Sequence, residues 1–156
     1  MKSKIHEFRL QKYVGVSKNI FFVVLAIVCS SATISAQSKA PKEVETAFYS
    51  KFPKATKVKW DKENATEYEA SFTENNIKQS ANYSSKGEWL ETESPTTFVQ
   101  LPAKVQNTFN TSHKGAKIKA VAKIENNKGE TQYEIEVKKG LKTVEYFYNQ
   151  DGKLVQ

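Results

Sequence analysis

The stretch PKEVETAFYSKFPKATKVKW at residues 41–60 carries a pattern that returns as PAKVQNTFNTSHKGAKIKA at residues 102–120. Each copy starts with a proline, which suits the first position of a helix because its missing N–H has no helical partner there. Valine and phenylalanine then follow at helical spacing, as Val44 and Phe48 and again as Val105 and Phe109. Lysine-rich segments come next in both copies. The sequence therefore predicts the same unit, a helix followed by strands, written twice.

Alternation of apolar and polar residues predicts the strands that follow each helix. The residues expected to face the core are Val58, Trp60, Tyr68, Ala70, Phe72, Ala81, Tyr83, Ile118, Ala120, Ala122, Ile124, Tyr133, Ile135, Val137, Val144, Tyr146 and Tyr148. Turn residues separate these runs, for example at Asn75–Asn76 and Lys139–Gly140. We expect an α+β protein with two tandem repeats of one helix and an antiparallel sheet (α-β-β-β-β), over residues 37–94 and 95–156. Whether the repeats form one continuous unit or two docked lobes stays open.

The polar positions of these strands predict a solvent-exposed face. Lysines occupy the first strand of each half and glutamates the second, so opposite charges can pair across the sheet. Glu67 and Glu69 in the first half, and Glu134 and Glu136 in the second, are expected in water beside lysines. That setting is poor for the burial that would raise the pKa of a catalytic carboxyl group.

Residues 1–36 have the layout of a secretory signal peptide. Basic residues precede the apolar run IFFVVLAIV at residues 20–28, and Ala36 stands before a predicted cleavage site at Gln37. The alternative, an uncleaved anchor, is disfavoured because a membrane span needs about 20 apolar residues. Cys29, the only cysteine, follows Val28 rather than a small residue, which disfavours lipidation. We expect a periplasmic or secreted protein with no disulfide and no transmembrane span after cleavage.

Charge argues against nucleic acid as the partner. The leader holds five of the 24 basic residues and one of the 17 acidic ones, which leaves residues 37–156 with 19 lysines, 16 acids and no arginine. Arginine is the residue that best recognises phosphate and base edges. A surface on which lysine and glutamate are mixed is typical of a solvated protein.

Three motifs resemble a known family. They are the Pro-x-x-Val-x-x-x-Phe helix, FPKATKVKW at residues 52–60 and GEWLETE at residues 87–93. Together they resemble the PepSY-like domain of Bacteroidetes, also described as β-lactamase-inhibitor-like, in two copies over residues 41–156. The second copy departs from the pattern at Ser112-His113-Lys114, where the aromatic-proline pair is missing.

The resemblance implies a small, exported, non-catalytic protein in which a helix packs against an antiparallel sheet in each half. It also implies binding through the exposed sheet surface, because the inhibitor that the family resembles binds an enzyme in that way. This last expectation is an analogy between folds.

Candidate site residues are aromatic or apolar rather than catalytic. His113 is the only histidine after the leader and lies on an apolar stripe, so a half-buried structural role is expected. No catalytic, cofactor-binding or metal-binding set is recognisable, and no cofactor is expected. Exposed aromatic residues favour protein interfaces. The candidate protein-binding residues are Tyr49, Trp89, Leu90, Phe98 and Phe147; Phe147 is placed on the solvent-exposed face because it lies between Tyr146 and Tyr148.

Two functions are consistent with this pattern. The first is a binding protein for an unidentified envelope or secreted protein, such as a peptidase or hydrolase that it inhibits. The second is a periplasmic carrier of a small ligand, lipid or peptide, or an envelope-stress accessory protein, with its site between helix and sheet. An open apolar pocket there would support the second function, whereas a filled space would count against it. An enzyme is a third possibility, disfavoured because no catalytic constellation is present.

Overall fold

The computed structural model describes residues 39–155, so the predicted signal peptide at residues 1–36 lies outside the described part. Two α-helices, α1 (Lys42–Lys51) and α2 (Ala103–Ser112), confirm the two predicted helices. The remaining elements are the strands β1 (Thr56–Lys62), β2 (Glu67–Glu74), β3 (Ile77–Ser84), β4 (Trp89–Pro95), β5 (Lys117–Asn126), β6 (Thr131–Lys139) and β7 (Lys142–Asn149), and a short 3-10 helix, η1 (Phe98–Gln100).

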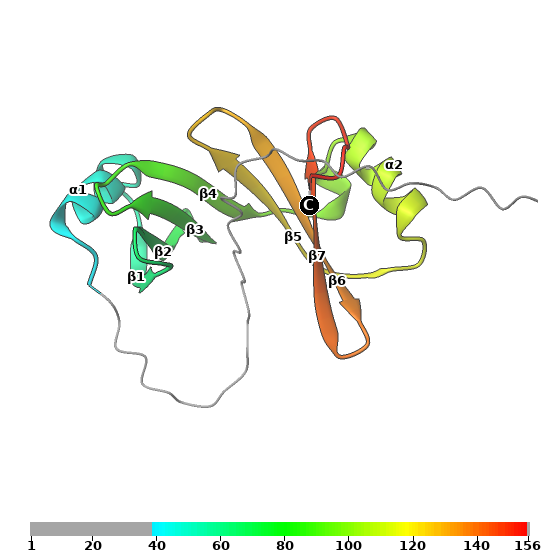
Figure 1. Ribbon diagram of the computed structural model, residues 1–156, viewed down its shortest axis with the longest axis horizontal. Helices are drawn as coiled ribbons and strands as arrows, with labels where there is room; N and C mark the ends of the chain where they lie inside the picture. The colour runs from blue at the N-terminus through cyan, green and yellow to red at the C-terminus, as the bar shows by residue number, and fades with distance from the viewer. Residues whose placement is uncertain (1–38, 156) are drawn as a thin grey trace, which may run out of the picture. The chain divides into compact units, whose positions relative to one another are not determined.

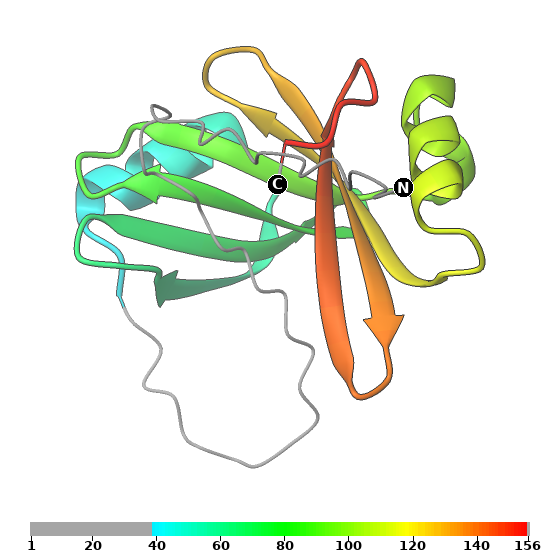
Figure 2. The ribbon, with the colours of Figure 1, turned by 45° about the vertical axis from the view of Figure 1, so that its right-hand side comes forward.

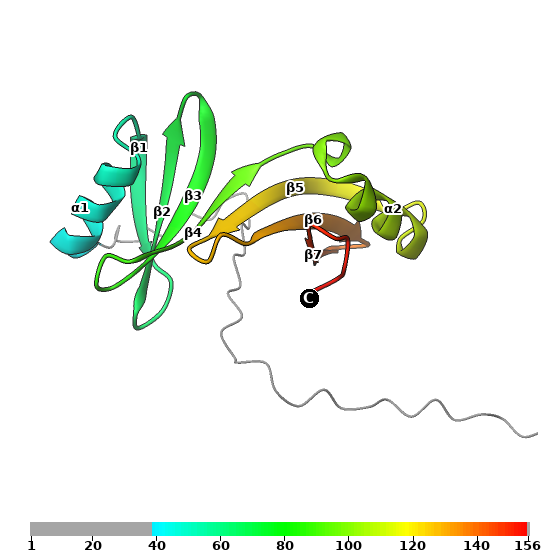
Figure 3. The ribbon, with the colours of Figure 1, turned by 90° about the horizontal axis from the view of Figure 1, so that it is seen from above.

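The seven strands form one antiparallel sheet in chain order, from β1 to β7 (Figures 1 and 3). The sheet passes from one half to the other without a break, because β4 pairs with β5 from Glu91↔Asn126 to Pro95↔Ala122. The first and second halves of the chain therefore form one continuous sheet. In the second half, three strands and an isolated bridge between Tyr148 and Leu154 stand where four strands were expected; the bridge belongs to the C-terminal segment that turns back beside β7 (Figure 2).

Each helix begins and ends for local reasons. Pro41 precedes α1, acids Glu43 and Glu45 occupy its first turn, and Lys51 its last, which complements the helix dipole. The helix stops at Phe52 because Pro53 follows. Pro102 precedes α2 in the same way, and His113 ends it.

Two apolar cores lie under the helices. The buried Val44 and Phe48 of α1 pack on Trp60, Phe72 and Tyr83, with the rings of Phe48 and Phe72 centred 4.9 Å apart at 85°. The second core is built from residues of α2 and of the second half of the sheet, together with Leu101 just before the helix: Leu101, Val105, Phe109, Val121, Ile135, Val137 and Tyr148. His113 is half-buried, as expected, and its ring lies 4.0 Å from that of Tyr146. Aromatic rings thus dominate the first core, whereas the second core is mostly aliphatic around Phe109 and Tyr148.

The predicted phase of β5 is wrong. A register shift between Ile118 and Ala120 displaces the alternation, so Val121 packs in the core under α2 while Ala120 is exposed. Ala122 and Ile124 point to the opposite face. A bulge inserts one unpaired residue and so inverts the facing of every residue that precedes it relative to those that follow.

Candidate functional site

Both α-helices of residues 39–155 pack on the same face of the sheet. Thr92 pairs with Ala81 of the first core. Ser94, two residues along β4, pairs with Lys123, which in turn pairs with Tyr133, a residue that packs against the second core. Residues two apart on a strand share a face. We call the other face the helix-free face; its central residues are Glu69, Ser80, Asn82, Glu91, Glu93, Ala122, Ile124, Glu134, Glu136, Glu145 and Phe147.

Burial of glutamates on the helix-free face overturns an expectation from the sequence. Glu134 and Glu136, expected in water, are only 3% and 5% exposed, and Glu93 is 8% exposed. Phe147 points to this face, as predicted from its neighbours, but at 7% exposure it is not the exposed anchor that was expected. Ala122 and Ile124 of β5 are buried beside them. The middle of this face is therefore a partly apolar, partly acidic surface rather than a solvated one.

Hydrogen-bond acceptors without donors accumulate here. Glu93 Oε2, Glu134 Oε1 and Asn82 Oδ1 are buried and have no hydrogen-bond partner in the structure. Asn82 is 2% exposed and uses its amide group to donate to Glu91 Oε1 at 3.4 Å. A buried acceptor without a donor destabilises the fold by the desolvation of that group. Such groups call for an explanation, and a ligand that donates hydrogen bonds would supply one.

Burial and like charge act together on these carboxyl groups. Burial, reinforced by the charges of neighbouring glutamates, raises the pKa of Glu93 from 4.5 to about 7. The same causes raise the pKa of Glu134 to about 8, against the weaker opposing effect of Lys119. The two side chains lie on β4 and β6, on either side of β5, where Glu93 pairs with Ile124 and Glu134 with Ala122.

Half-buried glutamates surround this buried centre. Burial raises the pKa of Glu69, Glu91 and Glu145 above the usual value, although hydrogen bonds from Ser80 and Asn82 lower those of Glu69 and Glu91 in part. The pair Lys119–Glu136, with Nζ 2.8 Å from Oε2, is the salt bridge that reaches this centre. Other lysines of the face lie at its margin: Lys59 on the edge strand β1, Lys78 near the start of β3, Lys117 at the start of β5 and its partner Lys138 near the end of β6. The centre of the helix-free face is thus acidic.

The candidate residues named from the sequence lie in separate places. Tyr49 is 48% exposed on α1. Trp89 is half-buried, donates through Nε1 to Thr92 Oγ1 at 2.9 Å, and lies under Lys51, whose Nζ is 3.7 Å from the ring centroid. Leu90, also half-buried, is the extra residue at the β3–β4 register shift. Phe98 packs on Phe109 at 5.4 Å. The structure does not gather these side chains into one patch.

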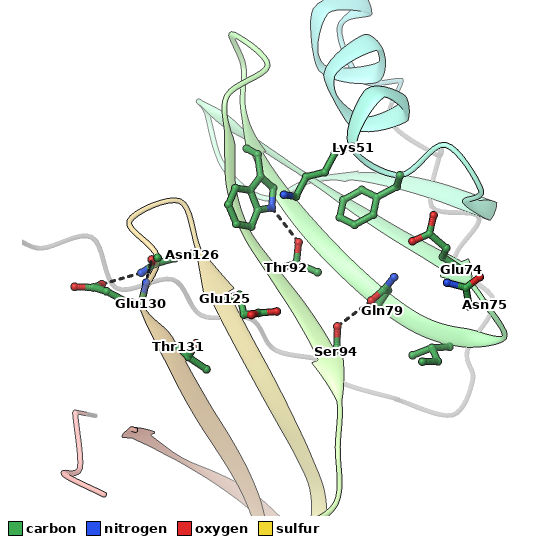
Figure 4. Close-up of a pocket in the computed structure, with 14 residues that line it drawn as sticks. Lys51, Glu74, Asn75, Gln79, Thr92, Ser94, Glu125, Asn126, Glu130 and Thr131 are labelled. Atoms are coloured by element: carbon green, nitrogen blue, oxygen red, sulfur yellow. Dashed lines mark hydrogen bonds between the residues drawn. The ribbon is translucent and has the colours of Figure 1, made fainter. Parts of the chain in front are cut away.

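A cleft opens on the other face, beside α1 (Figure 4). Its volume is about 530 Å³, and its lining comes from the end of α1, from β2 to β4, and from the β5–β6 hairpin. Polar and apolar surface contribute almost equally to its lining, and several of the polar groups already bond to one another, as Ser94 does to Gln79 at 2.8 Å and Asn126 to Glu130 at 2.9 Å (Figure 4). Phe52, Ile77 and Trp89 supply the apolar part.

Metal binding and acid–base catalysis each need a particular grouping of ionisable side chains. Over residues 39–155, no group of three His, Cys, Asp or Glu side chains has the geometry to hold a metal ion. Carboxyl groups with a raised pKa can act as catalytic acids. Neither Glu93 nor Glu134 lines the cleft or the shallow depression around Tyr49, however, so a substrate held there would not reach them.

Sequence reasoning missed the buried glutamates because their burial depends on the pairing of β4 with β5. Period-two alternation places Glu91 and Glu93 on one face, and Glu134 and Glu136 on one face, but it does not reveal that the two pairs share a continuous sheet. The usable signal was the repeat of Glu-x-Glu on β2, β4 and β6.

Comparisons with known proteins agree with this fold. A family model described as "Putative beta-lactamase-inhibitor-like, PepSY-like" matches residues 66–156. A crystal structure of "putative periplasmic proteins" from Bacteroides eggerthii is 20% identical, with 76% of this chain and 88% of that chain covered and a TM-score of 0.70. A BLIP-like protein from Bacteroides fragilis is 21% identical, with 79% and 88% covered and a TM-score of 0.65. A DUF2874 family protein from Bacteroides ovatus is 23% identical, with 76% and 86% covered and a TM-score of 0.67.

No curated protein matches the chain. Within residues 39–155, no helix is long and apolar enough to cross a membrane.

Proposed function

We propose a binding role for this chain, which belongs to the β-lactamase-inhibitor-like, PepSY-like family. In this role the chain is an exported, non-catalytic protein that binds an envelope or secreted protein. Where the bound protein is an enzyme, binding inhibits it. The observation that carries the proposal is the set of buried acceptors without donors on the helix-free face, at Asn82, Glu93 and Glu134. A partner that covers this face can provide donors and exclude water. Similarity to periplasmic and BLIP-like proteins supports export and binding, and the predicted leader at residues 1–36 supports export.

The same proposal includes the origin of the two halves as tandem copies, over residues 37–94 and 95–156. Each half has a helix that buries a valine and a phenylalanine. Each also has a register shift at the start of its first strand, between Thr56 and Lys59 and between Ile118 and Ala120. Such bulges are retained features rather than accidents, which favours a common origin.

The experiment is an affinity capture from the envelope and secreted fractions. The full chain, tagged at its C-terminus and processed by the host, is compared with a Ser71→Trp variant that obstructs the helix-free face and a Thr111→Trp variant on the exposed side of α2. Ser71 is half-buried in β2 and pairs with Lys59 and Ser80. We expect the wild type and Thr111→Trp to retain the same protein and Ser71→Trp to lose it. No captured protein, or equal capture by a folded Ser71→Trp variant, would contradict the proposal.

Small-ligand binding is a second candidate function, but at a site other than the space between helix and sheet that was expected from the sequence. The space between α1 and the sheet is filled by Phe48, Phe52 and Phe72, which counts against a ligand site there. The cleft beside α1 offers another place for a small ligand, with a volume of about 530 Å³ and with Trp89 on its wall. The other candidate residues, Tyr49, Leu90 and Phe98, stay proposals for partner contacts outside the helix-free face.

A further inference from the structure

We propose that the helix-free face receives lysine or arginine side chains of its protein partner, at the centre formed by Asn82, Glu93 and Glu134. This inference rests on the proposed binding function and specifies the chemistry of the partner. Three properties of the centre carry it: the kind of polar atom, the missing donors and the distribution of charge.

Once Glu93 and Glu134 are ionised, the polar atoms of the centre are almost all acceptors. Asn82 Oδ1, Glu93 Oε2 and Glu134 Oε1 are buried without a donor. Asn82 is the independent observation, because it is neutral, 2% exposed and faces the same side as its cross-strand neighbours Glu69 and Glu91. An amide oxygen between carboxylates matches a ligand that brings only donors. Ammonium and guanidinium groups have that property.

Charge complementarity selects a cationic partner. Lys119 forms a salt bridge with Glu136, and the other lysines of this face lie at the ends of strands or on the edge strand. Within residues 39–155 no salt bridge reaches Glu69, Glu91, Glu93, Glu134 or Glu145, although the charge of Lys119 also acts on Glu134 and Glu145. Glu69, Glu91 and Glu145 are half-buried and form the accessible rim, while Glu93 and Glu134 form the floor. A long side chain can pass the rim with its apolar stem against Phe147 and Ile124 and place its charge near the floor.

A metal ion fits the centre less well than an organic cation. No three carboxylate or histidine side chains of the described part converge with metal-ligand geometry. The acceptors instead lie on three different strands, β3, β4 and β6, and the strand pairing sets their positions. A protein segment with several basic side chains can meet such a spread set, and its rim contacts add electrostatic steering.

The test measures binding of acetylated, amidated hexalysine by NMR titration of the host-processed protein. We expect saturable shifts in the helix-free face and an affinity about tenfold lower in the double variant Glu93→Gln/Glu134→Gln. The matched control Glu43→Gln/Glu45→Gln removes two acids from α1 and should stay within about twofold of wild type. Equal losses in the two double variants, or none in the first, would overturn the proposal.

Two further arms separate the alternatives. If spermidine or Ca²⁺ shifts the same resonances and binds as tightly as hexalysine does, the assignment to a protein partner is overturned. Capture of the native partner from the envelope and secreted fractions gives the second arm: a partner that Ser71→Trp loses but Glu93→Gln/Glu134→Gln retains would leave the binding face in place and refute the cationic centre. If both variants lose the partner while each keeps a wild-type amide spectrum outside the mutated strands, the result supports both the binding face and the cationic chemistry of the partner.

Discussion

Gly152 lies directly against the backbone carbonyl of Lys104, so close that a Cβ on the glycine would stand 2.6 Å from that oxygen. Gly87 has the same relation to Glu43, where an added Cβ would stand 2.8 Å from the carbonyl oxygen. Lys104 and Glu43 are each the second residue of their helix, and both glycines have positive φ, +76° and +83°. A glycine turn therefore fixes the start of each helix against the sheet in both halves.

Replacement of Gly152 by alanine should destabilise the protein by two separate effects. Positive φ costs an alanine about 1–2 kcal/mol, and the contact with a backbone carbonyl requires the helix or the turn to move. We expect a total loss of about 3 kcal/mol in the free energy of unfolding, measured by chemical denaturation. Gly129→Ala is the control, because Gly129 also has a φ of +76° but has nothing within 4 Å of the added Cβ. Equal losses at the two positions would show that the contact with Lys104 has no energetic role.

Much of this architecture follows from residue pattern alone. The helices were predictable because proline precedes a Val-x-x-x-Phe stripe, and the strands because alternation survives over long runs. The exception is β5, where the alternation that starts with the lysines at residues 117 and 119 predicts Ala120 in the core. The bulge between Ile118 and Ala120 shifts this alternation, so Val121 lies in the core instead. A bulge changes the facing of a strand without changing its composition, so the sequence offers no local sign of it.

The candidate site was less predictable than the fold because it depends on long-range pairing. Glu93 and Glu134 are separated by forty-one positions in the chain and come together only because β4 and β6 flank β5. Alternation correctly put Phe147 on the face opposite Tyr146, yet burial of that face depends on neighbours from other strands. The face to which a side chain points can thus be predicted from its own strand, whereas its exposure to solvent depends on the pairing of the whole sheet.

The continuity of the sheet predicts that the two halves unfold together. Both tryptophans, Trp60 and Trp89, lie in the first half, whereas Phe109 is buried in the second core. Phe109→Ala should lower the free energy of unfolding by about 3–5 kcal/mol. Because β4 pairs with β5, we expect tryptophan fluorescence to report this loss with the same midpoint as far-ultraviolet circular dichroism.

Phe48→Ala, in the first core, is the matched control for Phe109→Ala and should move both probes by a similar amount. A fluorescence transition that keeps its wild-type midpoint in Phe109→Ala would mean that the halves unfold separately.

Tyr83 should tolerate the loss of its hydroxyl group. Tyr83 is fully buried in the first core, and its hydroxyl oxygen is buried without a hydrogen-bond partner, so burial raises its pKa above the usual value. Tyr83→Phe should leave the free energy of unfolding unchanged or raise it by about 1 kcal/mol, since the desolvated hydroxyl is removed and the ring stays. Tyr83→Leu should lower it, because ring contacts with Phe48 and Trp60 are lost. A loss in Tyr83→Phe as large as in Tyr83→Leu, by thermal denaturation, would contradict this account.

The acidic centre predicts that stability falls as pH rises. The pKa of Glu93 is raised from 4.5 to about 7, and that of Glu134 to about 8, so between these limits the folded state keeps protons that the unfolded chain releases. The free energy of unfolding must then decrease from about pH 4.5 upward and level off above about pH 8. For Glu93 alone the shift corresponds to about 3 kcal/mol. The charged groups around the two carboxyls are Glu69, Glu91, Glu136, Glu145 and Lys119.

Glu93→Gln isolates this effect, because glutamine keeps the size of the side chain and carries no charge at any pH. The variant should be more stable than wild type at pH 8.5 and about equal to it at pH 4.5, so its profile of unfolding free energy against pH should be flatter. Urea denaturation at half-unit steps of pH measures the slope, and Glu43→Gln on the exposed side of α1 should reproduce the wild-type slope. If Glu93→Gln and the wild type lose stability in parallel from pH 5 to pH 8, the carboxyl of Glu93 is not held protonated by the fold, and the acidic centre is already compensated in the free protein.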